Sequence, residues 1–218
     1  MKTALTLFAA GLLACLTAAP AMAQQPATAK KTQPVVYVAY LHGMNRSVVG
    51  SDPSGVAHFT VRGDRLTIRI NMRGVPPDLQ HWQHFHGFVD GRTARCPGPD
   101  ADVNHDGIID LLETEPASGV TMVPFNAKPA AMDVTANTYP RASARGTYIY
   151  RATVSMKALQ AAFGKAFKGA SLDLDKRVVY IHGVPADTKL PATVKSLGTI
   201  PAQVTLPIAC GAIRRVSN

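Results

Sequence analysis

Histidines at alternating positions form the first group of residues that could do chemistry. Residues 81–86 have the sequence HWQHFH, which places His84 and His86 two positions apart. Side chains at i and i+2 of a β-strand point to the same face, so both imidazoles can reach one metal ion. A third histidine, His182, ends a strongly apolar run and is a candidate for the same site. The alternative is that these histidines are structural, as a single strand histidine usually is.

A run of oxygen-bearing side chains forms the second candidate site. Residues 102–113, DVNHDGIIDLLE, fill each diagnostic position of the twelve-residue EF-hand calcium loop, with Gly107 at the sharp turn. Two prolines just upstream exclude the usual incoming helix, so we expect a structural calcium clip rather than a sensor. The alternative is an acidic loop that holds no metal. The expected calcium ligands are Asp102, Asn104, Asp106, the Ile108 carbonyl, Asp110 and Glu113.

The elements that must position these residues are mainly β-strands. A short helix is expected over 156–167, with Ser155 as its N-cap. Residues 91–145 are rich in Pro, Gly, Asp and Asn, which predicts one long metal-binding loop. Seven or eight short strands with long connections predict an all-β sandwich or barrel in one domain, 35–218. Strand patterns occur at 35–42, 56–61, 66–72, 82–89, 147–154, 177–182 and 204–216.

The first 23 residues have the form of a secretory signal peptide. Lys2 gives a positive start, residues 4–19 are apolar, and 21–23 (AMA) form a small-x-small cleavage site. We therefore expect a periplasmic or secreted protein that begins with a flexible polar leader over 24–34. The alternative is a lipoprotein anchored through Cys15, because residues 12–15 (LLAC) loosely resemble a lipobox.

Composition excludes several protein classes. The chain has 218 residues, of which 46% are hydrophobic and 17% charged. Beyond the signal no run of eighteen apolar residues occurs, which excludes a multi-span membrane protein. For the same reason we expect no transmembrane span. The formal net charge of +9 is spread along the sequence rather than clustered, so we expect no nucleic-acid partner.

Two cysteines remain after signal cleavage, Cys96 and Cys210. In an oxidising compartment such a pair most often forms one disulfide, which would contribute about 4–5 kcal/mol by restricting the unfolded chain. The alternative is two free, buried thiols.

The order of these residues resembles the copper/zinc superoxide dismutase family. His84-Phe85-His86 is followed by Cys96, then by His182, and then by Cys210 within the sequence IACGAI. The resemblance implies a Greek-key β-barrel with His84, His86 and His182 as copper ligands, superoxide as substrate, and a bond between the two cysteines. His105, or else His81, would complete the copper site.

Two features depart from that family. Between Cys96 and His182 the only histidine is His105, and the EF-hand-like segment stands where zinc ligands belong, so zinc is not expected. Residues 205–209 lack the arginine that guides superoxide in the family. Residues 55–74 also resemble chordin-type repeat domains, which are not known primarily for catalysis.

Three functions are consistent with these residues. The first is an exported copper-binding, superoxide dismutase-like metalloprotein, whose positive charge would favour encounter with an anion. The second is a non-catalytic periplasmic copper-binding protein, stabilised by calcium and the disulfide. The third is a calcium-dependent envelope or adhesion protein in which the histidines are structural. We also consider a homodimer as the assembly.

Overall fold

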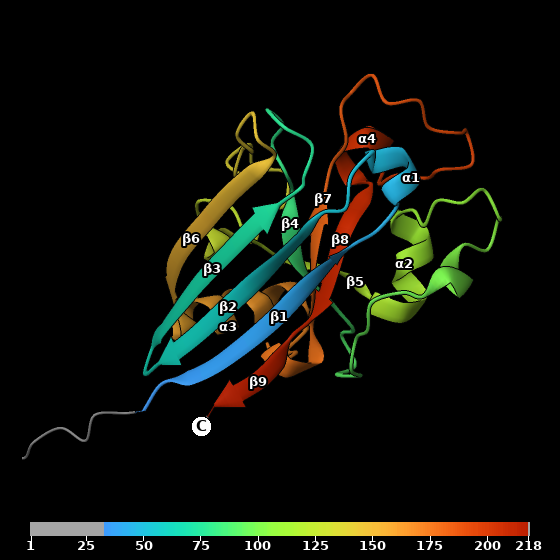
Figure 1. Ribbon diagram of the computed structural model, residues 1–218. Coiled ribbons are helices and arrows are strands. Elements are labelled where there is room, and N and C mark those ends of the chain that lie inside the picture. The colour runs from blue at the N-terminus through green and yellow to red at the C-terminus, as the bar shows by residue number, and fades with distance from the viewer. Residues whose placement is uncertain (1–32, 218) are drawn as a thin grey trace, which may run out of the picture. The chain divides into compact units, whose positions relative to one another are not determined.

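The computed structural model describes residues 33–217, and in this part of the chain nine strands form one antiparallel sheet that curls into a half-barrel (Figure 1). The strands are hydrogen-bonded in the order β5-β4-β7-β8-β1-β2-β3-β6, and β9 pairs with β1. The predicted all-β class is confirmed. The strands are β1 (Val35–Gly43), β2 (Ser54–Arg62), β3 (Arg65–Arg73), β4 (Gln83–Gly87), β5 (Val120–Pro124), β6 (Thr147–Ser155), β7 (Val178–His182), β8 (Pro207–Ala212) and β9 (Arg214–Ser217).

Short helices connect the strands. The predicted helix is α3, and it begins where expected, because the Ser155 hydroxyl accepts a hydrogen bond from the Ala158 amide at 3.0 Å. Its Leu159 and Phe163 are fully buried in the core. The described helices are α1 (Arg46–Val49), α2 (Leu111–Ser118), α3 (Met156–Ala166) and α4 (Ala202–Thr205), with 3-10 turns η1 (Pro99–Ala101), η2 (Pro129–Ala131) and η3 (Leu174–Lys176).

One prediction about the connections was wrong. Residues 91–145 are not one loop, because they contain α2 and β5. β5 pairs with β4 at an edge of the sheet. Pro124 at its end has no backbone N–H, and an edge strand tolerates a proline because one of its sides has no neighbouring strand. So short an edge strand, ending at a proline, leaves little strand pattern in the sequence.

The predicted last strand, 204–216, is also interrupted. The chain forms α4 before β8 begins, and Ile213 separates β8 from β9. Ile213 is buried, and its amide donates to the Arg177 carbonyl at 3.0 Å, one residue beyond the pairing of Val178 with Ala212. Both β8 and β9 pair with β1, so β9 continues along β1 past the end of β7.

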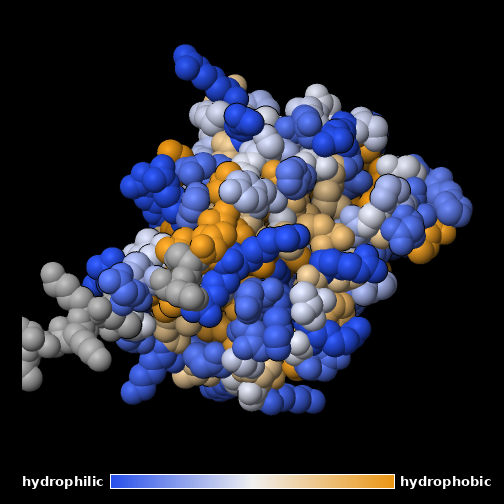
Figure 2. All heavy atoms as spheres, turned by 60° about the horizontal axis from the view of Figure 1, so that its bottom comes forward, coloured by the Kyte–Doolittle hydropathy of each residue, from blue (hydrophilic) through white to orange (hydrophobic). Residues whose placement is uncertain are grey.

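The sheet has one core face and one outer face. On β3, Leu66, Ile68, Ile70 and Met72 alternate with exposed residues and are buried, as predicted from their period of two. They pack in the main core with residues such as Phe59 of β2. Figure 2 shows one end of the molecule, where hydrophobic and hydrophilic side chains are intermixed.

The outer face is covered over only one half of the sheet. On β4 and β7, Phe85, Val179 and Ile181 belong to the main core. The residues that alternate with them are also buried, under the segments that carry α2 and the connection 183–201. Every residue of β4 and β7 is consequently buried, and these two strands lie at the centre of the candidate site.

The predicted disulfide is present. Cys96 and Cys210 are bonded, with their Cα atoms 5.9 Å apart, and the bond joins the segment after β4 to β8. A disulfide is compatible with an exported protein. Among the described residues no helix is long and apolar enough to cross a bilayer. The predicted signal peptide, almost all of the leader, and Cys15 lie outside the described residues.

Replacing both cysteines with alanine should lower the free energy of unfolding by about 4 kcal/mol, because the bond closes a long loop in the unfolded chain. The measurement is urea-induced unfolding of the Cys96→Ala/Cys210→Ala variant beside the oxidised protein. Reduced wild-type protein is the matched control, since it lacks the bond but keeps both side chains. Equal midpoints and slopes for all three samples would contradict a stabilising role.

Candidate metal centre

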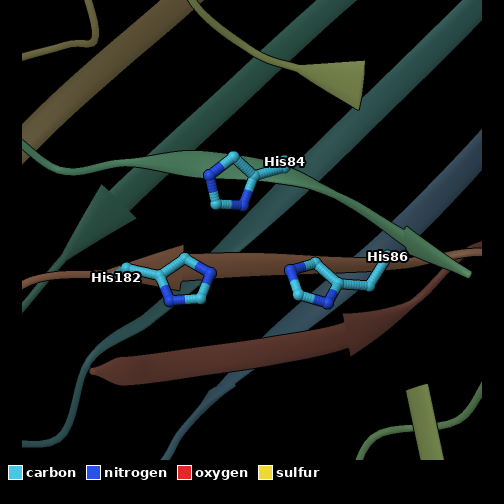
Figure 3. A group of neighbouring side chains, drawn as sticks. All are labelled: His84, His86 and His182. Atoms are coloured by element: carbon cyan, nitrogen blue, oxygen red, sulfur yellow. The ribbon is translucent and has the colours of Figure 1, made fainter. Parts of the chain in front are cut away.

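Three buried histidines converge at one point on the covered outer face (Figure 3). His84 and His86 lie on β4, and His182 ends β7, its neighbour in the sheet. The ring centroids of His84 and His182 are 4.8 Å apart, and those of His86 and His182 are 5.8 Å apart. His84 and His86 are two positions apart on β4 and share a face, and β7 pairs with β4. The strands therefore bring together the three histidines that the sequence predicted as metal ligands.

Each ring has one buried nitrogen without a hydrogen-bond partner. These atoms are His84 Nδ1, His86 Nδ1 and His182 Nε2, all buried. A buried polar atom left unsatisfied costs about 1–3 kcal/mol, so three of them in one place indicate a ligand site. One ring nitrogen from each residue lies within 4.8 Å of the others. Two ligands of one ion at about 2.1 Å can be at most about 4.2 Å apart, so binding would draw the rings slightly together.

Hydrogen bonds fix which nitrogen is available. His182 Nδ1 lies 2.7 Å from the Thr205 carbonyl oxygen, which can only accept, so Nδ1 carries the proton and Nε2 keeps its lone pair. His86 Nε2 lies 3.2 Å from the Thr121 hydroxyl on β5. Thr205 thus lies on the far side of the His182 ring, and such partners typically orient histidines that bind metals. The His86 nitrogen beside Thr121 is the one turned toward His182 in Figure 3.

Burial keeps the three imidazoles neutral. Loss of solvation lowers the pKa of His86 to about 3 and that of His182 to about 4, and the proximity of His182 adds to the effect on His86. Burial first, and then the neighbouring rings of His182 and His86, lower the pKa of His84 well below its usual value. Neutral imidazole is the form that binds metal ions, so the site is ready to bind at neutral pH.

Aromatic and aliphatic side chains surround the histidines. Trp82 stacks on Tyr139 with ring centroids 5.4 Å apart, and both present an edge to His84. Tyr180 lies on the same face of β7, with its ring 4.5 Å from that of His86. The sequence analysis did not identify these aromatic residues, although Tyr180 stands two positions before His182.

A narrow cleft leads to the histidines. It reaches His84 and His182, and its other walls are apolar residues together with two threonines. The apolar walls come from α2, from the connection between β7 and α4, from the residue before β4 and from the connection between η2 and β6. They are Trp82, Leu111, Val134, Leu197 and Ile200.

His81 supports the site but does not face it. Its Nδ1 lies 3.0 Å from the His182 carbonyl oxygen, and its Nε2 lies 2.9 Å from the Pro76 carbonyl oxygen. Because carbonyl oxygens only accept, a neutral His81 donates to one of these two carbonyls, and burial lowers its pKa. The ring also stacks on Tyr148. His81 therefore holds the backbone of His182 in place.

His105, the least certain of the predicted copper ligands, lies elsewhere. It is exposed, with φ of 57°, within the acidic loop, and it is not a member of the histidine group. In residues 33–217 no group of three or more His, Cys, Asp or Glu side chains gathers its ligand atoms so closely except His84, His86 and His182.

The acidic loop is folded by its own side chains. The Asp102 carboxylate accepts from the amides of Asp106 and Gly107, at 3.2 and 2.9 Å. Asn104 accepts from the Asp106 amide, and Asp106 from the Ile108 amide, both at 2.9 Å. Gly107 has φ of 81°, a left-handed conformation that suits the predicted sharp turn.

The end of the loop is also the start of a helix, which the sequence analysis missed. Asp110 caps α2 by accepting from the Leu112 and Glu113 amides, and Glu113 accepts from the Asp110 amide, forming a capping box. The other Glu113 oxygen accepts from the Val103 amide at 3.1 Å and closes the loop. The D-x-x-E pattern in the sequence was the signal for this cap.

The acidic loop holds the connection that covers the histidines. Asp106 accepts a 2.5 Å hydrogen bond from the Thr193 hydroxyl, and buried Asp110 accepts one of 2.6 Å from the Lys195 amide. Two residues further on, Leu197 forms a wall of the cleft, as does Leu111 at the start of α2. Asp110 consequently joins two walls of the cleft to each other.

No protein-family model and no curated protein matches the sequence. The site is therefore interpreted from its own geometry. Three neutral, buried imidazoles with ligand atoms within 4.8 Å of one another can hold one metal ion.

The metal-free protein should lose stability as the pH falls from about 6.5 toward 4. The unfolded histidines bind protons in this range while the buried ones do not, so each contributes up to about 1.4 kcal/mol per pH unit. The measurement is urea unfolding of chelator-treated protein at several pH values. His86→Gln should flatten the slope, and the exposed His58→Gln is the control. An unchanged slope in His86→Gln would contradict the buried neutral state.

Proposed function

We propose that this chain is an exported copper-binding protein of the superoxide dismutase type, with His84, His86 and His182 as ligands. The observation that carries the proposal is the group of three buried histidines whose ligand atoms lie within 4.8 Å of one another, each with one ring nitrogen that has no hydrogen-bond partner. The third function considered above, in which the histidines are structural, leaves those nitrogens unexplained.

Copper is favoured over other ions by two considerations. Among divalent first-row metals, sites built from nitrogen ligands bind copper most strongly, and imidazole suits both of its oxidation states. The order of the histidines and of the bonded cysteines along the chain is that of copper/zinc superoxide dismutases, and the all-β sheet agrees with it. When bound, copper would supply the one-electron chemistry needed to oxidise and reduce superoxide.

The protein's own residues would prepare the site for this role. Thr205 holds the proton of His182 away from the metal position, and His81 holds the His182 backbone. The apolar cleft keeps bulky reductants and chelators away while leaving a path for a molecule as small as superoxide. The formal net charge of +9 favours approach of an anion, an effect that salt weakens.

One observation favours the non-catalytic alternative. The residues that line the cleft include no lysine or arginine, so no local cation draws superoxide inward. A copper-binding protein that stores or transfers the ion, or protects it from reaction, would need no such cation. The catalytic and the non-catalytic alternatives therefore both require copper binding, and they differ only in whether the bound copper turns over superoxide.

We further propose that residues 102–113 bind calcium as a structural clip. Each ligand position is filled, Gly107 makes the required turn, and Glu113 already closes the loop onto Val103. Calcium would neutralise the carboxylates of Asp102, Asp106 and Glu113, and it would stabilise the segment that Asp106 and Asp110 hold over the cleft.

Copper binding should quench the fluorescence of Trp82, the single tryptophan of the chain, because its ring lies 6.4 Å from that of His84. Titration with Cu²⁺ should saturate at one equivalent. His84→Gln and His182→Gln should each weaken binding at least tenfold, because each removes one of three ligands. His105→Gln is the matched control and should bind normally. Unchanged titrations of the first two variants would contradict the proposed ligands.

A superoxide assay on the same samples separates the two alternatives. Turnover by the copper-loaded protein that exceeds free copper and is lost in His182→Gln would support a dismutase. Copper binding without turnover would support the non-catalytic function.

Calcium should raise the free energy of unfolding, by about 2.7 kcal/mol at a concentration one hundred times its Kd. Asp102→Asn and Asp106→Asn should remove most of this increase, because each deletes a charged ligand. Asp175→Asn, at an exposed carboxylate outside the loop, is the control. The measurement is thermal or urea unfolding with and without Ca²⁺. An equal response of all three variants would contradict a site in this loop.

A further inference from the structure

The outer face of strands β1, β2, β3 and β6 is exposed, in contrast to the covered half that holds the histidines. The four strands lie side by side across the front of Figure 1, and α3 lies behind them. Tyr40 and Ile149 on this face are 64% and 57% exposed, which is unusual for large apolar side chains on a sheet. They stand at the two ends of one cross-strand row, Tyr40-Val56-Asn71-Ile149.

Arginines occupy five outward positions of this face. Arg62 pairs directly with Arg65 across the β2–β3 hairpin, and Arg69 pairs directly with Arg151 of β6. His58 stands opposite Arg69 on its other side. Like charges directly opposite each other in a sheet repel, so this arrangement works against the stability of the fold. The five residues, defined as the arginine face, are Arg62, Arg65, Arg69, Arg73 and Arg151.

No carboxylate lies within the strands themselves, although Asp64 of the β2–β3 turn shares a hollow with Arg62 and Arg65. The nine strands contain no Asp or Glu. Asp52 and Asp64 flank the sheet at its ends, but Asp52 pairs with Arg46, and Asp64 accepts from Ser155 and the Lys157 amide. None of the ion pairs found in residues 33–217 includes a member of the arginine face.

The chemistry of the face indicates an anion with several phosphates in a plane. All of its cations are arginine, whose planar guanidinium binds phosphate with two parallel hydrogen bonds. The side chains stand on a broad sheet, four strands wide at about 4.8 Å each, rather than around a pocket. Tyr40 and Ile149 would lie among the headgroups, where partly apolar side chains are favoured.

We propose that the arginine face docks this protein on an anionic phospholipid bilayer. The inference is independent of the metal centre, because the face lies on strands that contribute none of the three histidines. Docking would hold the protein at a membrane surface and relieve the repulsion between Arg69 and Arg151.

Co-sedimentation with vesicles tests this proposal. The mature full-length protein should bind vesicles of phosphatidylglycerol and phosphatidylcholine but not of phosphatidylcholine alone, and binding should fall with salt. Arg69→Gln/Arg151→Gln should weaken binding roughly thirtyfold. Lys165→Gln/Lys189→Gln removes the same charge from exposed positions outside the arginine face and should bind like the wild type.

Two further measurements keep the outcome interpretable. The arginine variant should melt no lower than the wild type, because it loses a repulsive pair, so weaker binding would not reflect unfolding. Equal losses in both double variants would overturn the proposal. So would the absence of binding to anionic vesicles, or tighter binding to heparin or duplex DNA than to the vesicles.

Discussion

The burial of three neutral imidazoles side by side is the constraint on which the rest of this structure depends. Nothing in the hydrophobic core requires it, because His84, His86 and His182 lie on the side of β4 and β7 opposite the main core. Their desolvation is unfavourable unless a ligand uses the free nitrogens. The chain nevertheless covers them and orients His182 through Thr205, which is how a site prepared for a metal is built.

The cover depends on segments distant in sequence. Asp110 caps α2 and also accepts from the Lys195 amide, so one buried carboxylate joins two walls of the cleft. Asp106 adds a second connection through Thr193. Because both aspartates belong to the proposed calcium loop, occupation of that loop and access to the histidines would be coupled through these hydrogen bonds. The disulfide anchors the start of the same covering segment to β8.

Local patterns predicted most of the fold and the three histidines of the candidate metal centre. Alternation in β3, the His84/His86 spacing and the Ser155 cap each depend on residues close in sequence, and the two cysteines had only one pairing after signal cleavage. What the sequence did not reveal depends on pairing between distant segments. The short edge strand β5 exists because β4 is beside it, and Trp82 meets Tyr139 only in the folded chain. The arginine face is the clearest example, because its members are spread from residue 62 to residue 151 and form no run of charge.

X-ray absorption at the copper edge of the copper-loaded protein tests the central claim most directly, because it counts the ligands of the bound ion. The predicted spectrum contains three imidazole nitrogens at about 2.0 Å and no sulfur. It should change to two imidazoles in His182→Gln and remain unchanged in His105→Gln. A spectrum with fewer than two imidazoles, or one that is the same in the wild type and in His182→Gln, would contradict a copper site at His84, His86 and His182.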